Sequence, residues 1–325
     1  MTAPSLGIDV GGTKCLGVVI EGDGVRRDIV AETRAPTPYG GDALIEALVS
    51  IVGALEAGLG GDRPVGAIGV GAPGLITHAG VLRSSPNVPG VTDLDLGGRL
   101  GAALGRPVTV GNDATCAVLA EWTIGAARHA DDVVMVTLGT GIGGGVVAGG
   151  RLVTGANGFT GEFGHMVVDP NGPPCPCGRR GCWERYASGT GLAQLARTDA
   201  VGGRLRRVVE LAGGAPELVR GEHVQAAALE GDAGAMAVID EFARWVAIGL
   251  VNLTNALDPA AIVLGGGLAV GADLYLGPIE RWFDALLYSP ELRPHPDLVF
   301  AELGERAGAI GAAMLAASRA PGSSR

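Results

Sequence analysis

The chain begins with two short apolar runs that a pair of glycines separates. The first run covers residues 6–10, Gly11 and Gly12 interrupt it, and the second run covers residues 15–20. Two apolar runs joined by a short glycine turn are typical of a β-hairpin. The pattern therefore predicts a hairpin whose tip carries Gly and Thr.

The next hundred residues alternate between helical and strand patterns. Apolar side chains recur at helical spacing in residues 42–59, where Leu44, Leu48 and Leu55 share one face. Apolar strand-like runs and helical segments then follow each other, which predicts an α/β unit. The predicted strands are residues 65–70 and 108–110, and the predicted helices after residue 59 are 94–104 and 114–122.

Residues 133–150 form a long apolar stretch without charge, and this stretch is long enough for a membrane span. Seven of its positions are glycine, which disfavours a helix. We interpret it as a strand (133–138), a glycine turn and a second strand (145–148). The order repeats that of residues 6–20, so we expect two similar domains with glycine hairpins aimed at a common cleft. Later segments add strands at 151–154 and 261–264 and helices at about 189–197, 204–212, 222–229, 233–256 and 306–317.

Composition and charge limit the classes of function that the chain can have. The 24 basic and 34 acidic residues leave a net charge of −10, which argues against a nucleic-acid partner. A length of 325 residues with 47% hydrophobic content indicates two domains rather than a disordered chain. The N-terminal residues have neither a basic nor an apolar region of a secretory signal, so we expect a cytoplasmic protein without a membrane partner.

The glycine motifs allow several interpretations. Residues 139–144 satisfy G-x-G-x-x-G, but the residues that follow continue as a strand, which disfavours a dinucleotide-binding helix. Each hairpin is either an ordinary tight turn or a loop whose N–H groups cradle phosphate. The only lysine, Lys14, does not stand in the G-K-[ST] order of a Walker loop. Lys14 is therefore either a plain surface residue or a point charge beside phosphate.

Asp113 stands between a predicted strand and a predicted helix, in Gly-Asn-Asp. An Asp at such a place is commonly a helix N-cap. The alternative is a general base that accepts a hydroxyl proton during phosphoryl transfer.

Four residues have the chemistry of a closed zinc site. His165, Cys175, Cys177 and Cys182 offer one imidazole and three thiols, a tetrahedral set without an open position, so the zinc would be structural. Unliganded thiols are the alternative. Glu162 and Glu184 flank this segment as either solvated surface residues or acceptors for sugar hydroxyls.

Taken together, these motifs resemble the ROK family of sugar kinases and repressors. The resemblance is carried by residues 9–14, 111–113, 138–144, 161–165, 175–184 and 187–189, and 263–267, and it extends from about residue 6 to 317. It implies an α/β fold of the actin-like ATPase (ribonuclease H-like) type, with two domains around a nucleotide and sugar cleft. We place the small N-terminal domain at 1–113 and the larger domain at 114–305, with a zinc loop at 165–182 and the C-terminal helix packed back on the first domain.

The resemblance also implies roles for single residues. ATP with Mg²⁺ and a structural Zn²⁺ would be the cofactors, Asp113 the catalytic base, and His165, Cys175, Cys177 and Cys182 the zinc ligands. The sugar would be held by Asn87, Asn112, Asp113, Glu162, His165 and Glu184. The nucleotide would be held by Asp9, Gly11, Gly12, Thr13, Lys14, Thr137, Gly139, Thr140, Gly141, Gly265, Gly266 and Gly267.

The expected activity is phosphorylation of a hexose 6-hydroxyl, with glucose first. N-acetylhexosamine or fructose kinases with the same machinery, a polyphosphate donor and a non-catalytic sugar sensor remain alternatives. Two departures concern sugar preference: Val91 stands where many members have an aromatic residue, and residues 75–77 contain no acid. Because the first predicted strand begins at Leu6, we expect no DNA-binding domain, and we expect a homodimer or homotetramer.

Overall fold

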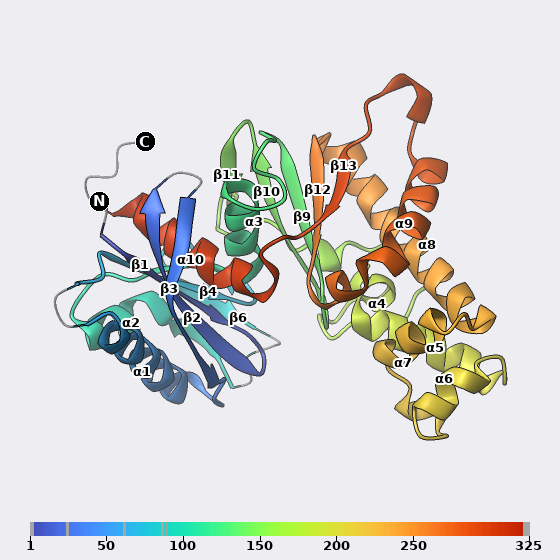
Figure 1. Cartoon of the computed structure of the whole chain (residues 1–325), viewed down its shortest axis with the longest axis horizontal. Coiled ribbons are helices and arrows are strands. Elements are labelled where there is room, and N and C mark those ends of the chain that lie inside the picture. The colour runs from blue at the N-terminus through green and yellow to red at the C-terminus, as the bar shows by residue number, and fades with distance from the viewer. Residues whose placement is uncertain (1–2, 24–25, 61–62, 86–87, 89, 321–325) are drawn as a thin grey trace. The chain divides into compact units, whose positions relative to one another are not determined.

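The computed structural model describes residues 3–23, 26–60, 63–85, 88 and 90–320 (Figure 1). Its chain forms two compact units. Unit 1 comprises Met1–Val133, Gly145–Gly161 and Glu302–Arg325, and unit 2 comprises Val134–Gly144 and Glu162–Ala301. The predicted division fell at residue 113, whereas unit 1 also contains residues 114–133 and 145–161.

Unit 1 is built around the first five-stranded sheet, in the order β3-β2-β1-β4-β8. Its strands β1, β4 and β8 run parallel, and β2 and β3 extend the sheet as antiparallel neighbours. The predicted first hairpin is confirmed, since Val10 pairs with Cys15 across its tip. The elements are β1 Ser5–Val10, β2 Lys14–Asp23, β3 Arg26–Pro36, α1 Gly41–Gly58, β4 Ala67–Ala72, β5 Leu75–Ile76, β6 Val81–Ser84, β7 Thr92–Asp95, α2 Leu96–Leu104, β8 Thr109–Asn112 and α3 Asp113–Thr123, with 3-10 turn η5 Gly304–Arg306 and α10 Ala307–Arg319 at the end of the chain.

The second sheet has the order β11-β10-β9-β12-β13. It repeats the plan of the first sheet, with a glycine hairpin and an antiparallel third strand on one side and two parallel strands on the other. The weak internal repeat in the sequence therefore has a structural counterpart. The strands are β9 Val133–Leu138, β10 Ile142–Ala148, β11 Arg151–Val153, β12 Ala261–Gly265 and β13 Asp297–Phe300.

Helices make up most of unit 2. The 25-residue helix α8 begins at the Asp232 cap, whose carboxylate accepts a hydrogen bond from the Ala235 N–H at 2.8 Å, and it ends at left-handed Asp258. Its apolar face joins the core of unit 2. The helices and 3-10 turns of this unit are η1 Phe163–His165, α4 Glu184–Ala187, α5 Gly189–Val201, α6 Arg206–Leu211, η2 Pro216–Leu218, α7 Gly221–Leu229, α8 Ala233–Leu257, η3 Gly267–Gly271, α9 Ala272–Leu286 and η4 Pro290–Leu292.

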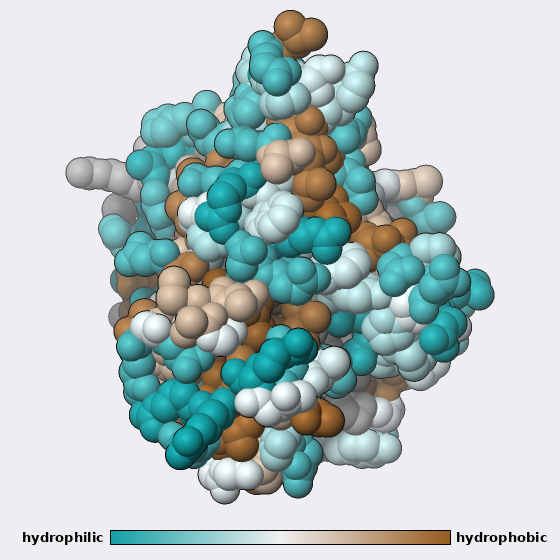
Figure 2. Space-filling view, turned by 90° about the vertical axis from the view of Figure 1, so that its right-hand side faces the viewer, coloured by the Kyte–Doolittle hydropathy of each residue, from teal (hydrophilic) through white to brown (hydrophobic). Residues whose placement is uncertain are grey.

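The surface of unit 2 is largely hydrophilic where its helices face solvent, with separate apolar patches between the polar residues (Figure 2). Leu229 at the end of α7 is an exposed apolar residue of this unit. Within the described residues, no helix combines the length and the apolar character that a membrane span requires.

The C-terminal helix α10 packs on β1 and β4 of the first sheet and on α3. Close approach of the backbones makes glycine necessary at these contacts. A Cβ on Gly69 would lie 1.9 Å from the Ala312 carbonyl oxygen, and a Cβ on Gly311 would lie 1.7 Å from that of Cys116. Part of the glycine excess therefore serves helix packing rather than turns.

Candidate active site and metal centre

Two carboxylates lie at one edge of the first sheet. Asp9 is near the end of β1 and Asp113 directly follows β8, and the parallel strands β1, β4 and β8 bring their carboxyl ends to the same edge. Burial, with the negative charge of Asp113, raises the pKa of Asp9 to about 7, against the opposing charge of Lys14. Burial also raises the pKa of Asp113, while a 2.8 Å hydrogen bond from the Ala114 N–H acts in the other direction. Carboxylates with raised pKa values are suited to accept a proton near neutral pH.

The capping role that the sequence allowed for Asp113 belongs to its neighbour. Asn112 is the N-cap of α3, and its Oδ1 accepts a hydrogen bond from the Thr115 N–H at 3.0 Å. The Asn112 amide also donates to the Gly74 carbonyl at 3.2 Å. The N-cap of α3 is therefore Asn112 and not Asp113, whose carboxylate accepts a local hydrogen bond from the N–H of the next residue, Ala114.

The first hairpin tip is anchored by Thr37 and exposed to solvent. Thr37 fixes it, because the Thr37 hydroxyl donates to the Gly11 carbonyl at 2.7 Å and the Thr37 N–H donates to the Thr13 carbonyl at 3.0 Å. Gly12, Thr13 and Lys14 are exposed. The tip thus presents backbone and one lysine to solvent. Thr37 belongs to none of the motifs identified in the sequence.

The second hairpin tip is held by the start of α5. The Gly189 N–H donates to the Gly139 carbonyl at 2.8 Å, and the Thr190 hydroxyl donates to the Thr140 carbonyl at 2.8 Å. On the strand before the tip, the Thr137 hydroxyl accepts from the Gly143 N–H at 3.1 Å. A segment about 50 residues away therefore fixes the turn, which the local sequence does not reveal.

The third glycine segment lies beside the end of β9. Gly266 has φ +87°, and a Cβ there would lie 2.6 Å from the Leu138 carbonyl oxygen. Gly265 closes β12 and Gly267 begins η3. The predicted nucleotide segments Thr137–Gly141 and Gly265–Gly267 thus come together within unit 2.

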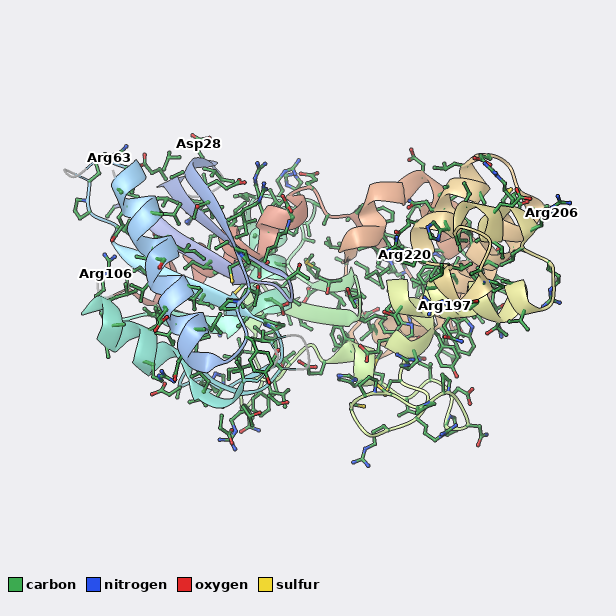
Figure 3. The ribbon with its side chains drawn as sticks, turned by 90° about the horizontal axis from the view of Figure 1, so that it is seen from below. Asp28, Arg63, Arg106, Arg197, Arg206 and Arg220 are labelled. Carbon is green, nitrogen blue, oxygen red and sulfur yellow. The ribbon has the colours of Figure 1, made fainter. Side chains whose placement is uncertain are left out.

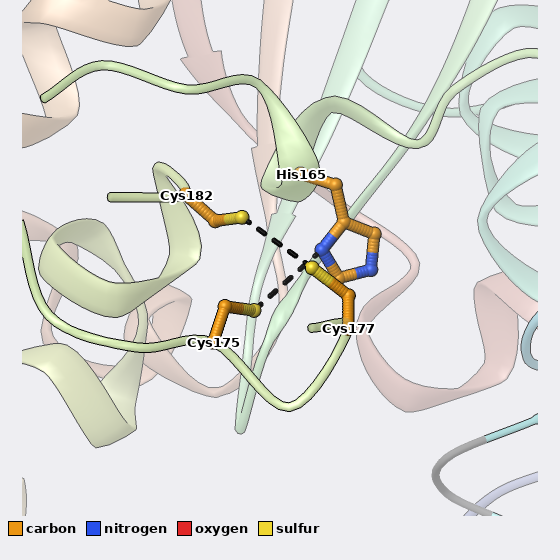
Figure 4. Close-up of side chains that lie close together, drawn as sticks. All are labelled: His165, Cys175, Cys177 and Cys182. Carbon is orange, nitrogen blue, oxygen red and sulfur yellow. Dashed lines mark hydrogen bonds between the residues drawn. The ribbon is translucent and has the colours of Figure 1, made fainter. Parts of the chain in front are cut away.

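The predicted zinc ligands also come together within unit 2 (Figure 4). The Sγ atoms of Cys177 and Cys182 are 3.6 Å apart, Cys175 Sγ is 3.9 Å from His165 Nδ1, and the four donor atoms all lie within 4.8 Å of one another. Zinc–sulfur bonds of about 2.3 Å separate tetrahedral sulfur ligands by about 3.8 Å. The cluster therefore fits a four-coordinate structural zinc, with Nδ1 as the histidine ligand.

The loop that carries the cysteines is tightly folded. The Cys175 N–H donates to the Arg179 carbonyl at 2.8 Å. Gly181 has φ +66°, and a Cβ there would overlap the Asp169 carbonyl oxygen. Trp183, fully buried, donates from its indole N–H to the Trp245 carbonyl at 2.7 Å. These contacts anchor the loop to the core of unit 2.

The two predicted sugar glutamates lie on either side of His165. Glu184 Oε1 is 3.8 Å from His165 Nδ1 and 3.2 Å from Cys175 Sγ, and Glu162 Oε2 is 3.9 Å from His165 Nε2. A metal on Nδ1 would leave Nε2 available for a hydrogen bond on the side of Glu162. Glu184 also approaches the second hairpin, since a Cβ on Gly141 would lie 2.8 Å from Glu184 Oε2. The predicted sugar residue Asn87 lies outside the described residues.

A sequence model of the ROK family matches residues 5–319. The chain belongs to the ROK family. Among its relatives, a glucokinase of Streptomyces coelicolor is 36% identical over 315 residues, covering 96% of this chain and 97% of that protein. An N-acetylmannosamine kinase of Escherichia fergusonii is 33% identical, covering 96% and 98%.

The fold of the chain is also similar to that of a solved ROK structure. The ROK family glucokinase of Streptomyces griseus, crystallised with glucose and AMPPNP, is 35% identical with a TM-score of 0.85, covering 97% of this chain and all of that one. The predicted ROK resemblance and the two-domain actin-like fold are therefore confirmed.

Proposed function

We propose that this ROK protein is an ATP-dependent hexose kinase that phosphorylates the 6-hydroxyl of the sugar, with glucose as its preferred substrate. The observation that carries the proposal is Asp113, a carboxylate with a raised pKa that Asn112 frees from capping α3. The glucokinase relatives and the AMPPNP complex of the S. griseus enzyme support glucose and ATP as the substrates.

In this mechanism each group has one task. Asp113 accepts the proton of the attacking hydroxyl. Glu162, Glu184 and the Nε2 atom of His165 bind sugar hydroxyls, and Asn112 contributes its amide. The glycine hairpins and Lys14 bind phosphate oxygens.

Mg²⁺ and zinc have separate roles in the proposal. Asp9 fits a Mg²⁺ ligand, because its Oδ1 is a buried hard oxygen without a hydrogen-bond partner among the described residues. When bound, Mg²⁺ would neutralise charge on the transferred phosphoryl group. Zinc at the Cys₃His cluster would order the loop that carries His165 and Glu184.

Asp113→Asn tests the proposed base. The amide keeps an oxygen that accepts the Ala114 hydrogen bond, so the variant should fold and bind glucose. Loss of a general base lowers turnover by about 10²–10⁴-fold. Kinetics of ADP release, with glucose binding measured by calorimetry, would check this. Turnover equal to that of the wild type would refute the role of Asp113.

The choice of sugar and donor needs its own assay. The N-acetylmannosamine kinase relative supports N-acetylhexosamines as the alternative substrates. ADP release should be compared across glucose, mannose, fructose, N-acetylglucosamine and N-acetylmannosamine. Sugar phosphate formation should then be compared between ATP and polyphosphate as donors. A higher kcat/KM for N-acetylmannosamine than for glucose would overturn the proposed preference. Light scattering would test the expected dimer or tetramer.

A further inference from the structure

Five charged side chains gather beside the first hairpin tip, all within unit 1. Lys14, Arg34 and Glu32 come from β2 and β3, and Glu305 and Arg306 come from the turn η5 before α10. The cluster contains three cations and two carboxylates. It therefore has a net positive charge next to the glycine tip, in a chain whose overall charge is −10.

The strand register explains how the cluster forms. Arg34 pairs with Leu16, and Glu32 pairs with Val18. Because side chains two residues apart on a strand point to the same face of the sheet, Lys14 lies on the same face as these two pairs. Leu16 and Val18 pack in the apolar cluster that includes α10 residues. The turn η5 at the start of α10 therefore brings its own charges onto the same face.

Glu305 bridges the two cations nearest the tip. Its Oε2 lies 2.5 Å from Lys14 Nζ, and its Oε1 accepts a hydrogen bond from the Arg34 guanidinium. Arg34 also contacts Glu32 at 2.9 Å, and Arg306 contacts the other oxygen of Glu32 at 2.6 Å. The hydrogen bond from Lys14 lowers the pKa of Glu305, so this carboxylate stays ionised.

Other arginines on unit 1 form simpler pairs. Arg63 pairs with Glu21, and Arg106 pairs with Glu56 (Figure 3). By contrast, Glu305 contacts the single lysine of the chain and one arginine at once. The side chains of Lys14 and Glu305 are 51% and 49% exposed, and ion pairs at that exposure are weak enough for a multivalent anion to displace.

We propose that Glu305 sets the affinity for the phosphate donor, because it occupies Lys14 and Arg34 until the terminal phosphates of the donor displace it. This inference rests on the proposed function, in which Lys14 binds phosphate. Glu305 is thus an internal competitor for the donor site. Arg34 becomes a second phosphate contact once Glu305 has moved away.

Glu305→Gln tests the competition, since it keeps the shape of the side chain and removes its charge. An exposed ion pair corresponds to at most about a fivefold change in an equilibrium constant. We therefore expect KM for ATP to fall about two- to fivefold while kcat stays within about twofold. Inhibition by tripolyphosphate should strengthen more, because it carries more charge. Both effects should shrink at high salt.

Two variants serve as controls. Glu302→Gln removes the same charge three residues earlier, where the carboxylate pairs with Arg128 at 3.0 Å rather than with Lys14. It should leave KM for ATP unchanged. Glu305→Asp keeps the charge and should return KM toward the wild-type value. An unchanged or raised KM in Glu305→Gln, or an equal drop in Glu302→Gln, would overturn the proposal.

Direct binding separates this inference from the proposed function. ATP and tripolyphosphate binding to each full-length variant should be measured by calorimetry without sugar. A wild-type protein that phosphorylates no hexose would refute the proposed function. If that protein still bound tripolyphosphate more weakly than Glu305→Gln does, the competition by Glu305 would stand. Equal affinities in an active kinase would refute the competition alone.

Discussion

Replacing Asp9 by Asn should stabilise the ligand-free protein in a pH-dependent way. The pKa of Asp9 is about 7 in the folded chain and 3.8 in the reference state. The raised value means that folding favours the protonated form. The stability that this form provides is complete below pH 3.8 and is lost as pH rises to about 7.

The size of the effect follows from the shift. About three pKa units, at about 1.36 kcal/mol each, set a ceiling of about 4 kcal/mol at pH 8. Asp9 Oδ1 has no hydrogen-bond partner among the described residues, so a buried Asn side chain would also be incompletely satisfied there, and we expect a gain of about 1–3 kcal/mol. The gain should grow between pH 4 and 7 and stay constant above.

Urea denaturation at pH 5 and pH 8, followed by circular dichroism without nucleotide or Mg²⁺, measures the gain directly. Asp28→Asn is the control, because Asp28 is exposed on β3 (Figure 3) and the same charge is removed there. A gain that is equal at both pH values, or larger at pH 5, would refute the reasoning. Asp9→Asn should also have lower kinase activity, since it loses the Mg²⁺ ligand of the proposed function.

Three further predictions concern the metal, the site and the packing. Cys177→Ser should lower zinc below one per chain in elemental analysis, whereas Cys15→Ser should retain it, and a metal-free active wild type would contradict the zinc assignment. Gly308→Ala would place a Cβ 2.7 Å from Asp9 Cγ, so we expect a lower kcat with an unchanged KM for sugar, and full activity would argue against a role for Asp9. Gly69→Ala should destabilise the protein by about 1–3 kcal/mol or more in thermal melts, because its Cβ overlaps α10. Gly53→Ala, with open space around it on α1, should instead be neutral or stabilising, and equal effects of the two would contradict the packing argument.

The sequence predicted the elements whose apolar pattern is strong and local. Both hairpins, α1 and α8 fall close to their predicted positions. The sequence pattern does not predict strand β3, because charged residues at 26–28, 32 and 34 interrupt its apolar positions along the edge of the sheet. Helix α9 was missed as well, since Gly277 and Pro278 interrupt its apolar pattern as a turn would.

The candidate site shows the same limit. The spacing of the zinc ligands is local, so the sequence was sufficient to predict that cluster. Lys14 was identified from its rarity, but its partner Glu305 is 291 residues away. The sequence also placed the capping alternative on Asp113, because it cannot tell which of two adjacent polar residues turns its side chain toward the helix.

The packing of α10 has a consequence for how the protein is made. The strands of the first sheet are residues 5–10, 14–23, 26–36, 67–72 and 109–112, but the helix that covers one of the sheet's faces is residues 307–319. During synthesis this face stays uncovered until almost the whole chain has left the ribosome. Unit 2 needs nothing beyond residue 301, so it has all of its residues first. We therefore expect nascent chains that stop before residue 307 to expose the apolar face of the first sheet and to need chaperones.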